Sequence, residues 1–380
     1  MSVAELTRNA VHVLPDGALE AKLALGRPLR VKLGIDVTSP DIHVGRGIPL
    51  QRMRAFQDEG HVGVLIIGDY TSRIGDPSGR SAERPILSDD EIDANAQTYV
   101  EQAHQILVPE QTEVRFNSEW LGRLTFAEVI RLTRIMTVAQ MLERDDFSDR
   151  YESGQPISVS ELLYPLMQAY DSVAVEADVE LGGTDQLYNL LAGREVMQAY
   201  GLEPQVALTM PLLLSWDGEK MSSSLGNNIP LAASPEEQFG RTMRISDDLL
   251  GEWYRLVLQD ELPPGADPLE SKLALARWIV ARSHGADAAV AAEAHFTRVV
   301  REGRAPEDLP EVALPEGDPV HVPAVLASAF GLSTSEARRL LAQGGVKVDG
   351  QALDALEVPR ASLAGAVLQA GKRRFARLTP

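Results

Sequence analysis

Two polar segments of this chain carry residues suited to binding a triphosphate. The first is HVGR, residues 43–46, which follows an alternating apolar run at residues 31–35. It opens an amphipathic stretch, and a helix start offers free backbone N–H groups and the positive end of the helix dipole to an anion. Gly45 permits close approach to the backbone, while His43 and Arg46 place two donors on one helix face. The segment therefore predicts a phosphate site between a strand and a helix.

The second segment is a polar loop, KMSSSLGN, which begins at Lys220 after an apolar run and a Trp-Asp-Gly turn. One ammonium group and three hydroxyls on a mobile loop can hold terminal phosphates and follow them as charge builds up during displacement. A serine-rich loop alone is more typical of a solvated turn. Its pairing with HVGR favours phosphate binding instead.

A third set of polar residues shares one predicted helix. Tyr164, Gln168 and Asp171 follow one another at spacings of four and three residues, so they lie on one face among apolar neighbours. Such a stripe is costly to bury unless it contacts a polar ligand, and the alternative is a stripe that faces solvent. The run GGTDQ at residues 182–186 favours the ligand, because its glycines allow close backbone approach and Asp185 can bind ribose hydroxyls.

The elements that must position these residues alternate between strands and helices. Residues 1–30 are expected to form a helical lead-in, and the helix after HVGR is expected to end near Gly60. Strands are predicted at residues 31–35, 62–67, 113–116, 173–181 and 206–214. Capping boxes mark helix starts at Ser88 with Glu91, Thr125 with Glu128, Thr137 with Gln140 and Ser158 with Glu161. This order predicts an α/β fold with a doubly wound, Rossmann-like parallel sheet.

Changes of composition divide the chain into four parts. Residues 1–232 are predicted to form the Rossmann-like catalytic domain. Strand-like runs are absent from residues 233–303, which are predicted to form an α-helical domain. Residues 304–323 hold five prolines among acidic residues, the composition of a semi-rigid linker. Residues 324–380 are predicted to form a small α+β module.

The charge is distributed unevenly. The net charge of −19 argues against a nucleic-acid partner, but residues 320–380 contain eight basic residues against four acidic ones. The chain has no cysteine and no zinc-type His spacing, so no structural metal is expected. No tract approaches the roughly 20 apolar residues of a membrane span, and the first residues lack a signal-peptide pattern, so a cytoplasmic protein is expected.

The two phosphate segments together resemble the signature motifs of class I aminoacyl-tRNA synthetases. The residues YxxxQAYD at 164–171, GGTDQ at 182–186 and GDPSG at 75–79 resemble those of tyrosyl-tRNA synthetases. The motifs cover residues 31–231, and the remainder agrees in domain order. The C-terminal segment resembles a small RNA-binding fold shared with a ribosomal protein and pseudouridine synthases.

The resemblance implies a role for each matching residue. It implies that Asp171 accepts a hydrogen bond from the phenol of tyrosine, while Asp76, Tyr164 and Gln168 bind the ammonium group. Gln186 would lie by the carboxylate, and Asn117 is a weaker match in the tyrosine site. The implied ATP-binding residues are Gly34, Asp36, Thr38, His43, Gly45, Gly182, Asp185, Lys220, Met221, Ser222, Ser223 and Ser224. The implied catalytic residues are His43, Arg46, Arg80, Arg84 and Lys220. Of these, Arg80, Arg84 and Lys220 match mobile basic residues that stabilise the departing pyrophosphate. The implied RNA-binding residues are Arg338, Arg339, Lys347, Lys372, Arg373 and Arg374.

Three positions depart from the family pattern. Arg46 replaces a second His, and Ser223 replaces a second Lys, although some members of the family share KMSSS. Lys32 stands where some branches have a Tyr that contacts the phenol, so either that contact is replaced or Lys32 lies on a solvated strand edge.

The resemblance implies activation of L-tyrosine with Mg²⁺-bound ATP, transfer to tRNA(Tyr) through an anticodon-binding helical domain, and a homodimer. The apolar residues between Thr125 and Glu143 suit a dimer interface, although ordinary core is an equal interpretation. Two functional alternatives remain: an RNA-binding paralogue with weak or lost activation, and activation of another amino acid such as tryptophan.

Overall fold

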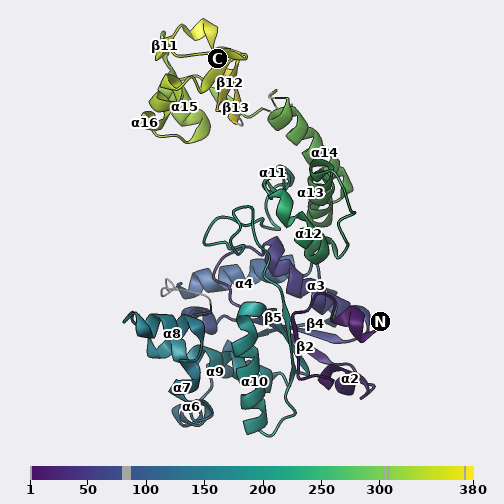
Figure 1. The fold of residues 1–380 in the computed structure, drawn as a ribbon. Coiled ribbons are helices and arrows are strands. Elements are labelled where there is room, and N and C mark those ends of the chain that lie inside the picture. Colours follow the sequence, from purple (N-terminus) through teal and green to yellow (C-terminus); the bar gives the residue numbers. More distant parts are fainter. Residues whose placement is uncertain (1, 79–86, 303, 306–308, 372–373) are drawn as a thin grey trace. The chain divides into compact units, whose positions relative to one another are not determined.

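The computed structural model describes residues 2–78, 87–302, 304–305, 309–371 and 374–380 (Figure 1). The chain divides into two compact units. The first is formed by Met1–Ala233 and Arg241–Leu275, and the second by Ser234–Gly240 and Ala276–Pro380. No helix among the described residues has the length and apolar character needed to cross a membrane.

The first unit is built on one six-stranded sheet in the order β1-β6-β5-β2-β3-β4. Only β1 runs antiparallel to its neighbour, and the other pairs are parallel. The strands are β1 (His12–Leu14), β2 (Arg30–Ile35), β3 (Val62–Ile67), β4 (Thr112–Phe116), β5 (Val179–Gly183) and β6 (Val206–Met210). The predicted Rossmann-like sheet is confirmed. Its central strands are largely apolar and buried, as a parallel sheet covered on both faces requires.

The winding of the sheet reverses beside β2. The chain passes from β2 through α3 to β3, whereas β5 and β6 lie on the other side of β2 and are joined by α10. Right-handed crossovers that depart in opposite directions place α3 and α10 on opposite faces (Figure 1). Ligands of such sheets bind at the carboxyl ends of the strands where the winding reverses, which here is between β2 and β5.

Helices surround this sheet and continue into the second unit. They are α1 (Val3–Leu6), α2 (Ala18–Leu23), α3 (Val44–Asp58), α4 (Asp89–Ala103), α5 (Ser118–Leu121), α6 (Phe126–Thr133), α7 (Val138–Met141), α8 (Asp145–Glu152), α9 (Val159–Ala174), α10 (Leu187–Ala199), α11 (Pro235–Thr242), α12 (Leu250–Trp253), α13 (Pro268–His284) and α14 (Ala286–Phe296). All four predicted capping boxes are present, so each reciprocal pair of hydrogen bonds sets a helix start.

Three local predictions were wrong. The first 30 residues include β1, because His12–Leu14 pairs with β6 and the His12 ring bonds Thr209 Oγ1 at 2.8 Å. The predicted strand at 173–181 begins only at Val179, because α9 runs on to Ala174. The predicted strand at 206–214 ends at Met210.

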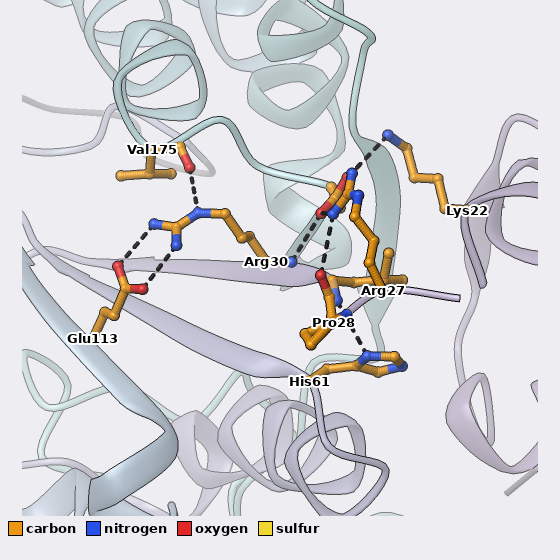
Figure 2. A network of polar contacts seen from close by, with 9 residues as sticks. Lys22, Arg27, Pro28, Arg30, His61, Glu113 and Val175 are labelled. Carbon is orange, nitrogen blue, oxygen red and sulfur yellow. Dashed lines mark hydrogen bonds and ion pairs between the residues drawn. The ribbon is translucent and has the colours of Figure 1, made fainter. Parts of the chain in front are cut away.

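A polar network joins the amino ends of β2, β4 and β5 (Figure 2). The Asp178 carboxylate accepts two hydrogen bonds from the Arg27 guanidinium, at 2.7 and 2.8 Å, and one from Arg30 N at 2.9 Å. Lys22 Nζ lies 3.5 Å from the same carboxylate. Arg30 in turn forms a bidentate ion pair with Glu113. These bonds join the segments before β2 and β5 to β4.

The predicted boundary at residue 232 differs from the division in the structure. Residues 241–275 belong to the first unit, although the sequence assigned them to the helical domain. The reason is burial: Trp253 is fully buried and its Nε1 donates to Leu214 O at 3.0 Å. Asn9 Nδ2 likewise donates to Arg255 O at 2.8 Å.

The second unit ends in a small α+β module. Its five-stranded sheet has the order β10-β9-β12-β13-β7, a pair β11-β8 lies beside it, and helices α15 (Val322–Phe330) and α16 (Thr334–Ala342) pack on each other. The strands are β7 (Glu311–Ala313), β8 (Val320–His321), β9 (Val346–Val348), β10 (Gln351–Ala352), β11 (Glu357–Val358), β12 (Val367–Ala370) and β13 (Arg374–Thr379). β7 and β8 fall within the predicted linker, so part of that segment belongs to the module: β7 pairs with β13 and β8 with β11.

Candidate active site

The HVGR segment forms the start of α3, as the sequence predicted. His43 is the N-cap residue, and its Nδ1 accepts a hydrogen bond from Arg46 N at 3.3 Å. His43 is only 6% exposed, and burial, with the nearby charges of Arg46 and Lys220, lowers its pKa well below the usual value. The imidazole is therefore neutral at pH 7. A Cβ on Gly45 would come within 3.2 Å of its ring, so glycine keeps space beside His43.

The Arg46 side chain is directed towards Tyr99. Its guanidinium donates to the Tyr99 hydroxyl and lies over the Tyr99 ring, 5.6 Å from the centroid. Tyr99, on α4, also contacts the loop after β2 through Ser39 Oγ at 3.2 Å. The arginine at this departure from the family pattern is thus held against Tyr99 of α4.

The KMSSS loop is exposed at its tip and anchored at both ends. Lys220 Nζ forms an ion pair with Asp185 Oδ2, which brings together two predicted ATP-binding residues. Before the tip, Met221 is buried and its N–H donates to Leu213 O at 3.0 Å. Ser222 Oγ lies 2.9 Å from Ser224 Oγ, and Ser223 Oγ accepts from Asn228 Nδ2 at 3.3 Å. The serine hydroxyls therefore bond within the loop.

The end of this loop is hydrogen-bonded to the HVGR segment. Val44 N donates to Ile229 O at 2.9 Å, and Leu231 N donates to Ile42 O at 2.8 Å. His43 and Pro230 form the bridge between these two bonds. The two segments that the sequence paired by their chemistry are thus joined through the backbone.

Glycines and polar side chains lie at the carboxyl ends of β2 and β5, where the winding of the sheet reverses. Gly34 has open space where a Cβ would stand, whereas a Cβ on Gly182 would come within 2.8 Å of Gln186 Cβ. Asp36, just after β2, accepts from Thr71 Oγ1 at 2.8 Å and from the Tyr164 hydroxyl at 3.0 Å. Thr38 lies half-buried on the same loop. Asp36 and Tyr164, assigned to different ligands, are therefore in contact.

The acidic loop after β3 contacts the start of α10. Gln186 Nε2 donates to Asp76 Oδ2 at 2.6 Å, and Gln186 Oε1 accepts from Asn189 Nδ2 at 3.1 Å. Asp76 also accepts from Ser78 N at 2.9 Å. Two residues predicted at the amino-acid site are thus brought together. Arg80 and Arg84, the predicted mobile basic residues, lie outside the described residues.

Asp171 is a buried carboxylate held by two donors. Trp120 Nε1 donates to its Oδ1 at 2.7 Å, and Asn117 Nδ2 lies 3.4 Å from its Oδ2. Burial raises the pKa of Asp171 to about 7, although the positive charge of Lys32 and these two hydrogen bonds act to lower it. The weaker prediction, Asn117, therefore lies beside the stronger one.

Several residues of this site were missed from the sequence. Trp120 was not predicted, although a tryptophan three residues after Asn117, on a short helix, shares the face of Asn117 and needs a partner for its N–H. Gln168 does not contact Asp171: its Nε2 donates to Glu180 Oε1 at 3.3 Å. Lys32 is fully buried, so the solvated strand edge is wrong. No local pattern marked Glu180 as its partner.

The predicted RNA-binding residues lie on the exposed surface of the C-terminal module. Arg338 and Arg339 are on α16, Lys347 is on β9 and Arg374 is on β13. Arg339 and Arg374 border one open depression of about 490 Å³, with Glu336 and Gln343 among its other lining residues. Lys372 and Arg373 lie outside the described residues.

The fold and the two joined basic segments define the class of protein: a class I aminoacyl-tRNA synthetase. Residues 24–299 match the family of class I tRNA synthetases for tryptophan and tyrosine. This family uses ATP as a substrate.

Similar sequences indicate which branch of this family the chain belongs to, and solved structures share its fold. A tyrosine–tRNA ligase of Moorella thermoacetica is 50% identical over 98% of this chain and 94% of its own length. One from Haemophilus influenzae is 46% identical over 99% and 96%. The tyrosyl-tRNA synthetase of Archaeoglobus fulgidus, solved with L-tyrosine, has a TM-score of 0.62 at 21% identity, over 76% of this chain and 98% of that one. The chain belongs to the tyrosyl-tRNA synthetases.

Proposed function

We propose that this chain activates L-tyrosine with ATP and transfers the tyrosyl group to tRNA(Tyr). The observation that carries the proposal is Asp171, a buried carboxylate whose two held oxygens leave lone pairs for a further donor. The phenol of tyrosine is such a donor, and neither phenylalanine nor tryptophan has a hydroxyl at this position. The relatives at 45 to 50% identity over nearly the whole chain support the same substrate.

The remaining amino-acid contacts follow the family pattern. Asp76, Tyr164 and Gln168 would bind the ammonium group of tyrosine, and Gln186 would lie near its carboxylate. Asp76 and Gln186 already form a 2.6 Å hydrogen bond, which supports a common subsite. Because this bond occupies one Asp76 oxygen, the ammonium would replace or share it.

We infer that adenylate formation needs no covalent intermediate with the protein. A carboxylate oxygen of tyrosine attacks the α-phosphorus of ATP in line, and the bond to pyrophosphate breaks, with Mg²⁺ entering on the phosphates of ATP. His43, Arg46 and Lys220, with the predicted Arg80 and Arg84, would stabilise the charge that develops. A ribose hydroxyl of the tRNA terminus then attacks the tyrosyl carbonyl, and AMP leaves.

The two basic residues must change partners during this reaction. Lys220 is paired with Asp185, which we assign to the ribose of ATP. Arg46 is directed to Tyr99. Binding of ATP would bring a competing partner for each, so Lys220 would exchange a carboxylate for phosphate oxygens. Its 48% exposed side chain supports this freedom.

An ATP–pyrophosphate exchange assay with tyrosine, phenylalanine and tryptophan tests the proposal. We expect exchange with tyrosine alone. Exchange with tryptophan would identify a different substrate. No exchange with any of the three, from a folded protein that binds tRNA, would favour an RNA-binding paralogue that has lost activation.

The tRNA would contact the second unit. We assign the helical residues up to about 303 to anticodon binding, and the exposed Arg338, Arg339, Lys347 and Arg374 to phosphate contacts. Phosphate contacts of this kind depend on salt, so the affinity for tRNA should fall steeply as the ionic strength rises. We expect these reactions to take place in the cytoplasm.

We further propose a homodimer built on the segment from Thr125 to Glu143, which forms α6 and α7. Phe126 is 80% exposed, Ile130 48% and Val138 58%, so these three apolar side chains are available to a partner. Leu132, Met136 and Met141 of the same segment are buried in the core. A second copy of the chain is the occupant that the family favours. Light scattering of Phe126→Asp tests this: we expect a monomer, whereas the matched substitution Val290→Asp, at a 64% exposed position on α14, should remain dimeric. A dimer in both variants would reject the interface.

A further inference from the structure

Lys32 is a buried cation in the middle of the sheet. It lies on β2, between β3 and β5, and its side chain has no exposure to solvent. Its ammonium group donates to Gln168 O at 2.9 Å, Ser172 Oγ at 2.7 Å and Glu180 Oε1 at 2.9 Å. An ammonium group has three N–H donors, so all of them are used. Lys32 therefore cannot donate to a substrate hydroxyl as the Tyr of other branches does.

Glu180 completes the pair from the neighbouring strand. Lys32 and Glu180 are directly paired in the register of β2 and β5, so their side chains project from the same face of the sheet. The Glu180 carboxylate accepts from Lys32 and also from Gln168 Nε2 at 3.3 Å, Ser172 Oγ at 2.9 Å and Gln205 Nε2 at 2.8 Å. Both charges are thus fully hydrogen-bonded without water.

The bonds of this pair converge on one turn of α9. The backbone carbonyl of Gln168 accepts a hydrogen bond from Lys32, and the side-chain amide of Gln168 donates one to Glu180. Ser172 accepts from one member of the pair and donates to the other. Asp171 lies between these two residues in the sequence, on the same turn. The position and direction of both Gln168 and Asp171 are therefore tied to the sheet by one ion pair.

Stability alone is a weak reason for such an arrangement. Two well-packed apolar side chains of similar volume commonly stabilise a fold as well as a buried ion pair does, or better. What apolar residues cannot supply is a set of directed hydrogen bonds to a helix turn. The charge of Lys32 lowers the pKa of the neighbouring Asp171 and the charge of Glu180 raises it, so the role of the pair rests on its hydrogen bonds.

We propose that the Lys32–Glu180 pair is a positioning element of the tyrosine site, which fixes the α9 turn that carries Gln168 and Asp171 and thereby sets the affinity for tyrosine. The inference rests on the proposed function, because it takes Gln168 and Asp171 as tyrosine ligands. Lys32 and Glu180 act through those two residues and do not touch the substrate.

Steady-state exchange kinetics of the double variant Lys32→Met/Glu180→Gln tests the proposal, because this variant removes both charges together and leaves neither one buried alone. We expect the KM for tyrosine to rise by up to about 10²-fold, since a displacement of about 1 Å in a binding group can have that effect. The KM for ATP should change less than about twofold. Gly34 and Gly182 share β2 and β5 with the pair, but beyond each other the side chains of Lys32 and Glu180 bond to Gln168, Ser172 and Gln205, none of which is assigned to ATP.

A second buried ion pair, between α8 and the first turn of α9, provides the matched control. Arg150 and Glu161 pair at 2.6 Å, and their side chains are 4% and 8% exposed. Glu161 lies two turns before Gln168 on α9. Arg150→Met/Glu161→Gln should leave the KM for tyrosine within about twofold of wild type. Equal rises in both double variants would show a general effect on folding and overturn the proposal, as would an unchanged KM in a folded Lys32→Met/Glu180→Gln protein.

Ser172→Ala covers the case in which the double variant does not fold. It deletes one bond to each member of the pair without exposing a charge, and we expect a several-fold rise in the KM for tyrosine alone. An unchanged KM here would contradict the proposal by itself. Absence of tyrosine-dependent exchange in the wild-type protein would instead refute the proposed function, so the two failures are distinguishable.

Discussion

Replacing Asp171 with asparagine should stabilise the fold while it removes substrate selectivity. Burial raises the pKa of Asp171 from its ordinary 3.8 to about 7. The folded protein therefore binds a proton at this site more tightly than the unfolded chain does. The two pKa values differ by about three units, and each unit corresponds to a free-energy difference of about 1.4 kcal/mol. Above pH 7 the buried, ionised carboxylate accordingly lowers the free energy of unfolding by roughly 4 kcal/mol.

The sign of this effect is opposite to that of most carboxylates. Because the folded-state pKa is raised, the wild-type protein gains stability as the pH falls from 7 towards 3.8, whereas the asparagine variant has nothing to titrate. The variant's advantage should thus shrink by roughly 3 kcal/mol between pH 8 and pH 5. Urea unfolding of both proteins at the two pH values measures it. Equal differences at pH 8 and pH 5 would refute a raised pKa at Asp171.

Asp178→Asn is a control of opposite sign. Burial alone would raise the pKa of Asp178, but hydrogen bonds from Arg27 and Arg30 N, with the charge of Lys22, outweigh it and the pKa is lowered. The contribution of Asp178 to stability is therefore present above its ordinary pKa and lost at lower pH. Asp178→Asn should destabilise the protein at both pH 5 and pH 8.

The same Asp171→Asn variant tests selectivity. A site built to bind a hydroxyl rejects the analogue that lacks it, and tyrosyl-tRNA synthetases are the known case, at about 10⁵ for tyrosine over phenylalanine. We expect the ratio of the two kcat/KM values to fall by several powers of ten. An unchanged ratio would remove Asp171 from the phenol site, whatever its effect on stability.

Three further predictions concern other parts of the chain. Lys220→Ala should lower the pre-steady-state rate of adenylate formation at saturating ATP by roughly 10² to 10³-fold, and a rise in the KM for ATP alone would make Lys220 a ground-state ligand. Arg338→Glu with Lys347→Glu should weaken tRNA aminoacylation and leave ATP–pyrophosphate exchange within about twofold of wild type; equal losses would give the module a role in the catalytic fold. Asp178→Ala should lower the urea-unfolding free energy by about 3 to 5 kcal/mol, since it leaves Lys22 buried without its partner, and a change under about 1 kcal/mol would mean that water replaces the carboxylate.

The sequence was most informative where local patterns decide structure. Each capping box is complete within four residues, so Ser88, Thr125, Thr137 and Ser158 marked helix starts that the structure confirms. The apolar runs of the parallel strands predicted their positions equally well. The residues at which a run begins or ends were harder to predict. Residues 173–174 are as apolar as a strand, but they end α9, which packs on α10.

Contacts between distant residues could not be predicted. Lys32 appears on a strand with no local partner, and only the register of β2 against β5 brings Glu180 beside it, 148 residues later. The direction of Arg46 towards Tyr99 likewise depends on how α4 packs. The position of β7 depends on β13, at the other end of the module. Such pairings arise from tertiary packing, which spacing along the chain does not encode.

The backbone bonds between residues 42–44 and 229–231 have a consequence for the length of the KMSSS loop. Because one end of this loop is fixed to the start of α3 and the other to Leu213, its tip can swing without changing where its ends lie. Residues inserted at the tip, near the 65% exposed Leu225, would increase the range over which the tip moves and slow its closure. The entropic cost of closing the loop would rise only slowly with its length. An insertion next to Ile229 would instead shift the helix start that holds His43. The same number of added residues should therefore be tolerated at the tip of this loop and abolish activation next to Ile229.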